Sequence, residues 1–179
     1  MFPKNILPRL KNVEVEKFLP CKPIEFLYRD IEDKNHTALL KTGKTIAGHH
    51  LSIMGQNPFL VFQSKGEDIT IYAEKPYRLK GNPFTYLQKI IDNYTKVAQP
   101  PDIPFSGGAI GAFSYDLKDV IEDIPSLCVD DINCCDMHFS FFSEFIIADE
   151  IEGNFYRLKF DTGSTGPPRG LGSGGKHHR

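Results

Sequence analysis

The feature that most restricts the fold is a glycine-rich run from Pro104 to Leu117, which reads Pro-Phe-Ser-Gly-Gly-Ala-Ile-Gly-Ala-Phe-Ser-Tyr-Asp-Leu. Its three glycines, Gly107, Gly108 and Gly111, interrupt residues that otherwise suit a β-strand. Glycine inside a strand costs backbone entropy and packs no side chain, so it usually marks a bulge or a close approach of another backbone. We expect that close approach at Gly108.

The residues between and after the glycines alternate in a way that predicts a strand covered on both sides. Side chains two positions apart share one face of a strand, so Phe113 and Tyr115 face one way and Ile110 and Ala112 the other. Asp116 is the expected cap of a short helical turn over residues 117–122.

The glycines do not form a phosphate-binding loop. Gly107-Gly108-x-x-Gly111 lacks the G-x-G-x-x-G spacing of a dinucleotide site, and no Lys-Ser/Thr pair follows it. The other candidate, Gly43-Lys44-Thr45, would need glycine at position 38, where the chain has Ala38. The sequence therefore predicts no nucleotide site.

Composition excludes several classes of function. The chain has 179 residues, of which 40% are hydrophobic and 25% charged, and a net charge of −2, as expected for one globular domain that does not bind nucleic acid. No apolar run approaches the roughly 20 residues that cross a membrane. The four cysteines form no C-x-x-C pair, which favours a reducing, cytoplasmic location.

Hydrophobic periodicity predicts an α+β domain with mostly antiparallel sheets packed face to face and two main flanking helices. The helices are expected at residues 23–33 and 83–97. The expected strands cover residues 13–17, 37–42, 49–54, 59–63, 68–72, 137–149 and 155–160. The domain is expected to occupy residues 1–160. Residues 161–179 are rich in glycine and poor in large apolar residues, which predicts a flexible tail that could be a cloning remnant.

No residue stands in a recognisable catalytic or metal-binding pattern. The best metal set is Cys134, Cys135 and His138, whose spacing matches no common zinc site and lacks a fourth ligand. His49 and His50 would point to opposite faces of a strand. The acidic pairs beside turns, such as Asp149-Glu150, are expected to be solvated. We predict no catalytic residues and no metal site in this chain.

The glycine-rich run and the later Asp136-Met137-His138-Phe139 resemble the N-terminal domain of component I of the chorismate-utilising synthases. This family comprises aminodeoxychorismate (para-aminobenzoate) synthase and anthranilate synthase. Its pattern is Pro-Phe-x-Gly-Gly-x-x-Gly-x-x-x-Tyr-Asp/Glu-Leu, then an Asp-Met element and a long strand that ends in an acidic hairpin. The resemblance covers roughly residues 20–160, and Phe-Ser-Tyr-Asp-Leu is closer to the aminodeoxychorismate branch.

The resemblance also implies a place for a small amino-acid ligand. Anthranilate synthases carry a Leu-Leu-Glu-Ser element and a Gly-Arg-Tyr-Ser strand that wall a tryptophan feedback pocket. The matching residues here are Leu40, Lys41 and Thr42, and then His50, Leu51 and Ser52. Lysine replaces the family glutamate, which removes the partner for a ligand ammonium and argues against tryptophan feedback. A strand pair that only packs is the alternative.

The function that the resemblance implies is that of a non-catalytic N-terminal domain in folate biosynthesis. The full enzyme aminates chorismate with ammonia from a glutamine amidotransferase subunit. Chorismate and its magnesium belong to a C-terminal domain that this chain does not resemble, so we expect no cofactor here and a surface, with Phe105, Phe113 and Tyr115, left uncovered. The alternatives are an anthranilate synthase domain of the tryptophan pathway and a free-standing small-molecule-binding module.

Overall fold

The computed structural model describes residues 6–32, 36–43, 50–95, 103, 105–122, 134–163 and 168–171. Of the residues singled out above, Lys44, Thr45, His49 and Pro104 lie outside these ranges, as does most of the segment 161–179. The strands are β1 Val13–Phe18, β2 Ala38–Lys41, β3 Leu51–Lys65, β4 Asp68–Tyr72, β5 Pro76–Lys80, β6 Ala109–Phe113, β7 Met137–Asp149 and β8 Asn154–Phe160. The helices are α1 Ile24–Arg29, α2 Pro83–Tyr94, the 3-10 turn η1 Tyr115–Leu117 and α3 Lys118–Ile121.

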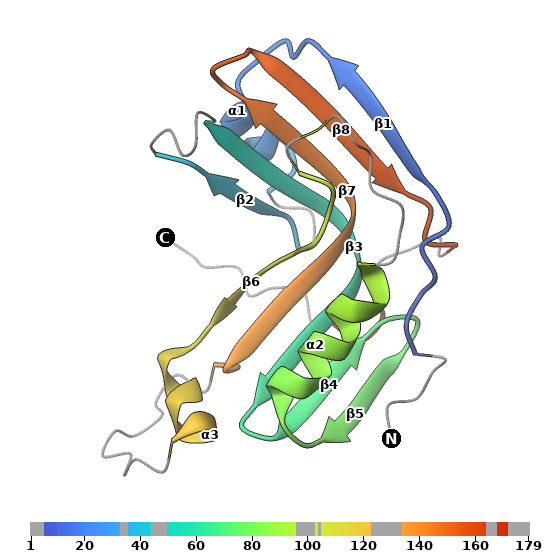
Figure 1. Ribbon diagram of the computed structural model, residues 1–179, viewed down its shortest axis with the longest axis vertical. Coiled ribbons are helices and arrows are strands. Elements are labelled where there is room, and N and C mark those ends of the chain that lie inside the picture. The colour runs from blue at the N-terminus through green and yellow to red at the C-terminus, as the bar shows by residue number, and fades with distance from the viewer. Residues whose placement is uncertain are drawn as a thin grey trace.

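Two long antiparallel strands, β3 and β7, form the centre of the sheet (Figure 1). Each is flanked by different strands along its two halves. At one end, β8 and β1 extend the sheet beyond β7 and β2 pairs with β3, which gives the order β1-β8-β7-β3-β2. At the other end, the order is β6-β7-β3-β4-β5. We call these the upper and the lower half-sheet.

The two half-sheets meet at a bulge in β3. The pairing with β7 shifts register between Pro58 and Leu60, and Asn57 has a positive φ of 54°. The two separate strands expected at residues 49–54 and 59–63, with the turn residues Gly55-Gln56-Asn57-Pro58 between them, are one strand, so this expectation is wrong. The same residue types instead form an irregularity within one strand, because β7 pairs with β3 on both sides of it.

The domain is therefore mainly β, and the prediction of an α+β domain with sheets packed face to face is only roughly met. One curled sheet of eight strands carries the described fold. The helix predicted at residues 23–33 ends at Arg29, and the one predicted at 83–97 ends at Tyr94. Strand β5 was missed, because it is short and begins with Pro76, as edge strands can.

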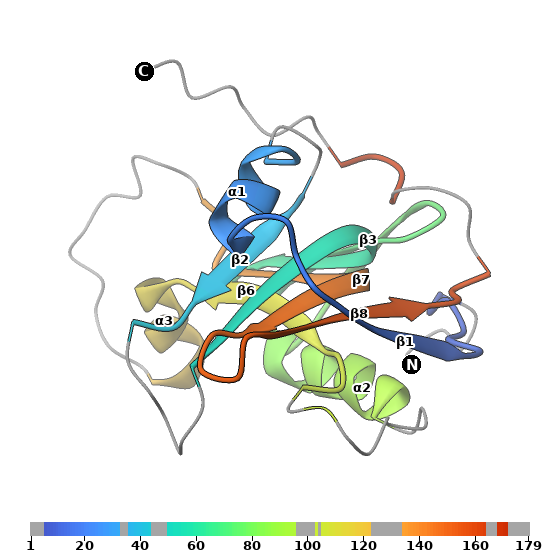
Figure 2. The same cartoon turned by 90° about the horizontal axis from the view of Figure 1, so that it is seen from above.

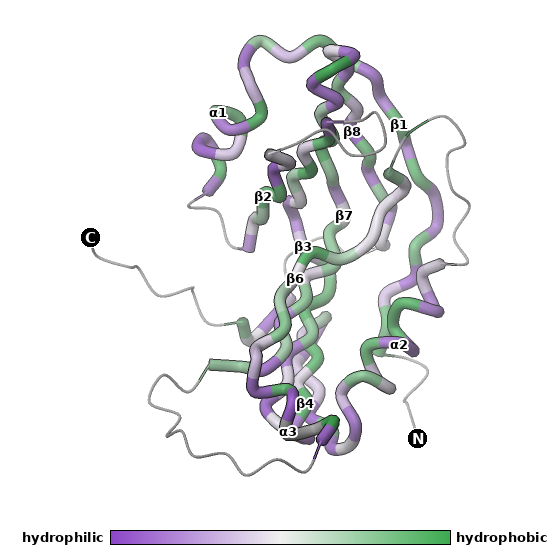
Figure 3. Tube along the Cα trace, turned by 60° about the vertical axis from the view of Figure 1, so that its left-hand side comes forward, coloured by the Kyte–Doolittle hydropathy of each residue, from purple (hydrophilic) through white to green (hydrophobic). Residues whose placement is uncertain are grey.

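Each face of the sheet is covered by a different element (Figure 2). Helix α2 packs Leu87 and Ile90 on the lower half-sheet, against the buried side chains of Leu60, Phe62 and Met137. Helix α1 packs Ile24 on one face of the upper half-sheet, beside Met54 and Ile146. The other face of the upper half-sheet holds Phe145 and Leu158, on which Ile103 and Phe105 pack. The hydropathy colouring of Figure 3 alternates along α2, as it does in an amphipathic helix.

Part of the segment after residue 160 contacts the domain. The backbone N–H of Lys11 donates to the carbonyl of Asp161 at 2.9 Å, and that of Arg169 donates to Ala73 beside β4 at 2.9 Å. The flexible tail stays a prediction. In the described residues, no helix is long and apolar enough to cross a bilayer.

Candidate functional site

The structure brings the predicted ligand-binding residues together where β2 pairs with β3. Leu40 faces Ile53 and Lys41 faces Ser52 in the antiparallel register, which places Thr42 opposite Leu51. His50 directly precedes β3 on the same edge. Residues 40–42 and residues 50–52 thus form one continuous patch, because the pairing of β2 with β3 brings them side by side. Leu40 is 53% exposed, whereas Ser52 is fully buried.

The polar groups of this patch are hydrogen-bonded to the protein itself. The Thr42 hydroxyl donates to the Leu51 carbonyl, and Nε2 of His50 contacts the Thr42 carbonyl. The Ser52 hydroxyl donates to Oε1 of Glu150 at 2.9 Å. These bonds fix the strand end, and a ligand would have to use the remaining lone pairs of the two hydroxyls.

Two carboxylates that the sequence analysis did not connect with this patch complete the charge pattern. Lys41 forms an ion pair with Glu25 of α1, and Nδ1 of His50 lies 3.6 Å from Oε2 of Glu150. The lysine that replaces the family glutamate therefore has its own partner. Glu25 and Glu150 are far from the patch along the chain, and no local pattern in the sequence placed either of them beside it.

A hollow of about 540 Å3 lies beside this patch, between α1 and the turn from β7 to β8. It is lined by Pro20, Cys21, Lys22, Pro23, Ile24, Glu25, Glu150, Gly153 and Phe155. Both carboxylates thus face the hollow and the patch at once. They could accept the ammonium group of a small ligand, in competition with Lys41 and His50.

The glycine-rich run shows where backbone approaches backbone. A Cβ on Gly111 would lie 2.1 Å from the carbonyl oxygen of His138, on the neighbouring strand β7. On Gly107 it would lie 2.7 Å from the ring of Phe160. At Gly108 nothing is nearer than 3.9 Å, and only its positive φ of 152° favours glycine. The close approach expected at Gly108 is therefore at Gly111.

The end of this run also differs from its prediction. Strand β6 pairs with β7, but Gly111, Ala112 and Phe113 are exposed, so the strand is not covered on both sides. Phe113 and Tyr115 are 56% and 85% exposed, as expected for the uncovered surface, whereas Phe105 packs edge-to-face on Phe145 at 5.1 Å.

The cap of the helical turn is Ser114 rather than Asp116. The Ser114 hydroxyl accepts from the backbone N–H of Asp116 at 3.1 Å, while the Asp116 side chain is exposed beside Lys118.

Asp136, from the Asp-Met element, is buried and has a structural role. Its carboxylate accepts from the N–H of Gly66 at 2.6 Å, lies 3.3 Å from Nζ of Lys65, and its carbonyl accepts from Ser114 at 2.7 Å. It joins the β3–β4 turn to the end of β6.

The remaining candidates do not form a reactive centre in the described part of the chain. No group of three His, Cys, Asp or Glu side chains there could hold a metal ion. Asp149 was expected in solvent but is buried, and its Oδ1 accepts from the N–H groups of Ile151 and Glu152 at 3.1 and 3.2 Å. It stabilises the turn between β7 and β8.

The fold of this chain is similar to part of a known structure. The crystal structure of anthranilate synthase component I from Streptococcus pneumoniae matches 70% of this chain and 28% of its own with a TM-score of 0.55 and 23% identity. That likeness concerns the fold. No protein-family profile matches the chain.

Curated relatives carry the same signal in sequence. Anthranilate synthase component 1 of Acetivibrio thermocellus is 32% identical over 155 residues, which is 83% of this chain and 30% of that protein. Aminodeoxychorismate synthase component 1 of Bacillus subtilis is 27% identical over 137 residues, or 74% and 28%. The chain thus spans under a third of the length of these relatives. Its homologues are component I proteins of anthranilate synthase and of aminodeoxychorismate synthase.

Proposed function

We propose that this chain is a non-catalytic, N-terminal part of an aminodeoxychorismate synthase component I-like enzyme. It would support a chorismate-binding domain that holds magnesium, and the whole would receive ammonia from a glutamine amidotransferase subunit in the cytoplasm. The observation that carries this proposal is the asymmetry of the match, since most of this chain aligns with only 28–30% of each relative.

The aminodeoxychorismate branch is favoured by the charge at position 41. In the family the glutamate of Leu-Leu-Glu-Ser would meet a ligand ammonium, whereas here Lys41 repels one and pairs with Glu25. Anthranilate synthase is the second candidate, because a component 1 of that enzyme is 32% identical. A small amino-acid ligand in the hollow beside Glu25 and Glu150 is part of the proposal for either branch.

The first test uses the chain alone with chorismate, magnesium and ammonia. We expect no product above the blank, and formation of aminodeoxychorismate or anthranilate would contradict the non-catalytic role.

The second test reads the coding DNA beyond residue 160. A frame that continues into a chorismate-binding domain supports the proposal, and the product of that longer protein identifies the branch. A natural stop soon after residue 160 would instead favour a free-standing binding module.

Tryptophan binding is tested by calorimetry on the chain. We expect no heat of binding from tryptophan, because Lys41 stands where the family glutamate would meet the ligand ammonium. Lys41→Glu restores the family residue and should improve tryptophan binding if the patch is the family pocket.

A further inference from the structure

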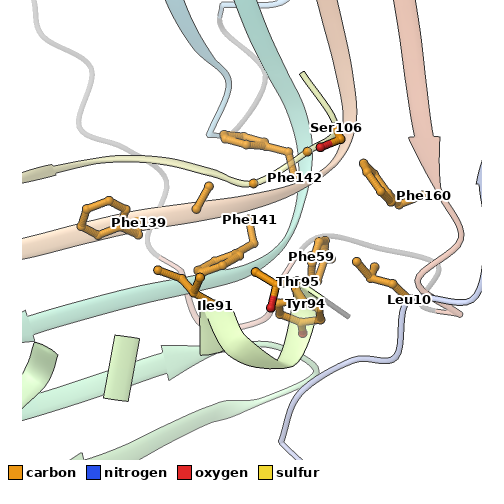
Figure 4. Close-up of a pocket in the computed structure, with 13 residues that line it drawn as sticks. Leu10, Phe59, Ile91, Tyr94, Thr95, Ser106, Phe139, Phe141, Phe142 and Phe160 are labelled. Carbon is orange, nitrogen blue, oxygen red and sulfur yellow. The ribbon is translucent and has the colours of Figure 1, made fainter. Parts of the chain in front are cut away.

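A second cavity, separate from the patch at β2 and β3, lies where the two half-sheets meet. Its volume is about 230 Å3. Figure 4 shows Ile91 and Tyr94 from the last turn of α2, with Thr95 directly after it, on one side and Ser106, Phe142 and Phe160 on the other. Six aromatic rings line it in all, those of Phe59, Tyr94, Phe139, Phe141, Phe142 and Phe160.

The cavity exists because a backbone without side chains passes over the aromatic cluster. Gly107 packs directly on the Phe160 ring, and Gly108 has no atom within 3.9 Å of the place where its Cβ would be. The last turn of α2 is held by Tyr94, whose hydroxyl donates to the Pro8 carbonyl at 3.0 Å, and by its edge-to-face contact with Phe59 at 5.3 Å. The walls are therefore fixed from both sides.

The polar groups of the cavity are few and uncharged. None of its described lining residues is Asp, Glu, Lys, Arg or His. Burial raises the pKa of Tyr94 far above its usual range, so that ring stays neutral. The Thr95 hydroxyl donates to Asp92, whereas the Ser106 hydroxyl has no hydrogen-bond partner among the described residues.

We propose that this cavity binds a small neutral aromatic molecule with one hydrogen-bonding group, which the Ser106 hydroxyl or the glycine peptides would meet. A cavity of about 150 Å3 with apolar walls is known to bind benzene, so the volume here leaves room for a substituted ring. A buried ionised group without a partner is costly, and this excludes charged ligands from the cavity.

The test is a titration of the full 179-residue chain with phenol, benzene and benzoate, in which methyl NMR spectra monitor binding. We expect phenol to bind with a Kd of about 0.1–1 mM, benzene more weakly and benzoate not at all. Methyl signals of Ala109, Leu10 and Ile91 should shift, because all three residues line the cavity, while that of Ala112 should not. No shift at Ala109 with phenol at saturating concentration overturns the proposal, and so does equal binding of benzoate.

Two variants and one control locate the site independently. Ala109→Leu fills the cavity and should abolish phenol binding, whereas Ala112→Leu, at an exposed position of the same strand that does not line the cavity, should leave it unchanged. Ser106→Ala should weaken phenol by about 3–10-fold, to the affinity of benzene, and Ser106→Thr should restore it. If Ala109→Leu binds phenol as the original chain does, the proposal fails. It also fails if the only effect of phenol is to dissociate a dimer. That result would mean that the cavity holds an aromatic side chain of a second copy rather than a small molecule.

Discussion

Among the three glycines of the glycine-rich run, Gly111 leaves the least room for a side chain. The place of its missing Cβ is 2.1 Å from the His138 carbonyl oxygen, which is a backbone atom and cannot swing away. We expect Gly111→Ala to lower the free energy of unfolding by about 2–4 kcal/mol through strain and overpacking. Urea denaturation measures this change.

Gly108 and Gly43 serve as matched comparisons for Gly111. Gly108→Ala meets only the cost of its positive φ, of order 1–2 kcal/mol, and Gly43→Ala meets open space. Equal losses at Gly108 and Gly111 would show that backbone conformation, rather than the contact with β7, explains the glycines.

His138 makes stability depend on pH. Burial, and then the charge of His36, lower the pKa of His138 below its ordinary 6.5. Its Nδ1 accepts from the Gln63 amide at 3.0 Å, and its Nε2 lies 3.4 Å from the Ser140 hydroxyl, so the neutral ring is the bonded form. The unfolded chain binds the proton more readily than the folded chain does. The contribution of the neutral His138 ring to stability is therefore fully present above pH 6.5, and it is lost as the pH falls from 6.5 toward the lowered folded pKa.

Replacement of the imidazole should remove this part of the pH dependence. As the pH is lowered from 7 to below 6.5, we expect the free energy of unfolding to fall less in His138→Gln than in the original chain. The measurement is urea denaturation at a series of pH values. A slope in the variant as steep as in the original chain would assign the dependence to other groups.

At the scale of elements, the bulge in β3 decides how the two half-sheets join. Asn57 has a φ of 54°, its side chain donates to Glu144 at 3.0 Å and its carbonyl accepts from Ser143 at 2.8 Å. We expect Asn57→Gly to change stability by less than about 1 kcal/mol and Asn57→Val to cost about 1–3 kcal/mol, because a β-branched residue resists positive φ. Thermal denaturation of the pair tests this, and equal melting temperatures would contradict it.

The elements that the sequence predicted are those with a strong local pattern. Residues 137–149 and 68–72 were predicted with the bounds that β7 and β4 have, because apolar alternation between turn residues is a local signal. The continuity of β3 was missed, since turns and bulges use the same residues and only the partner strand decides between them. The position of Glu25 and Glu150 beside the patch was missed for the same kind of reason. They reach the patch through contacts with Lys41 and Ser52 that depend on the whole fold.

At the scale of the whole molecule, one edge of the lower half-sheet is unfinished in the described part of the chain. Strand β6 pairs there with β7 alone, and beside it Phe113 stacks on Phe84 at 6.3 Å and contacts Phe139 at 4.8 Å. Phe113, Tyr115 and Ile121 are 56%, 85% and 66% exposed. An open strand edge beside exposed aromatic residues is a surface that tends to pair with another chain.

We therefore expect the chain to self-associate through this edge when no partner domain covers it, and the net charge of −2 opposes this only weakly. Sedimentation should show a concentration-dependent dimer, and the double variant Phe113→Ser, Tyr115→Ser should shift it to monomer. Leu19→Ser is the matched control, because Leu19 is 87% exposed but lies just after β1, outside the aromatic edge, and its loss should change nothing. A chorismate-binding domain added in trans should compete with the dimer, since both would use the same edge. A chain that stays monomeric and ignores that domain would contradict both this prediction and the scaffolding role proposed for the domain.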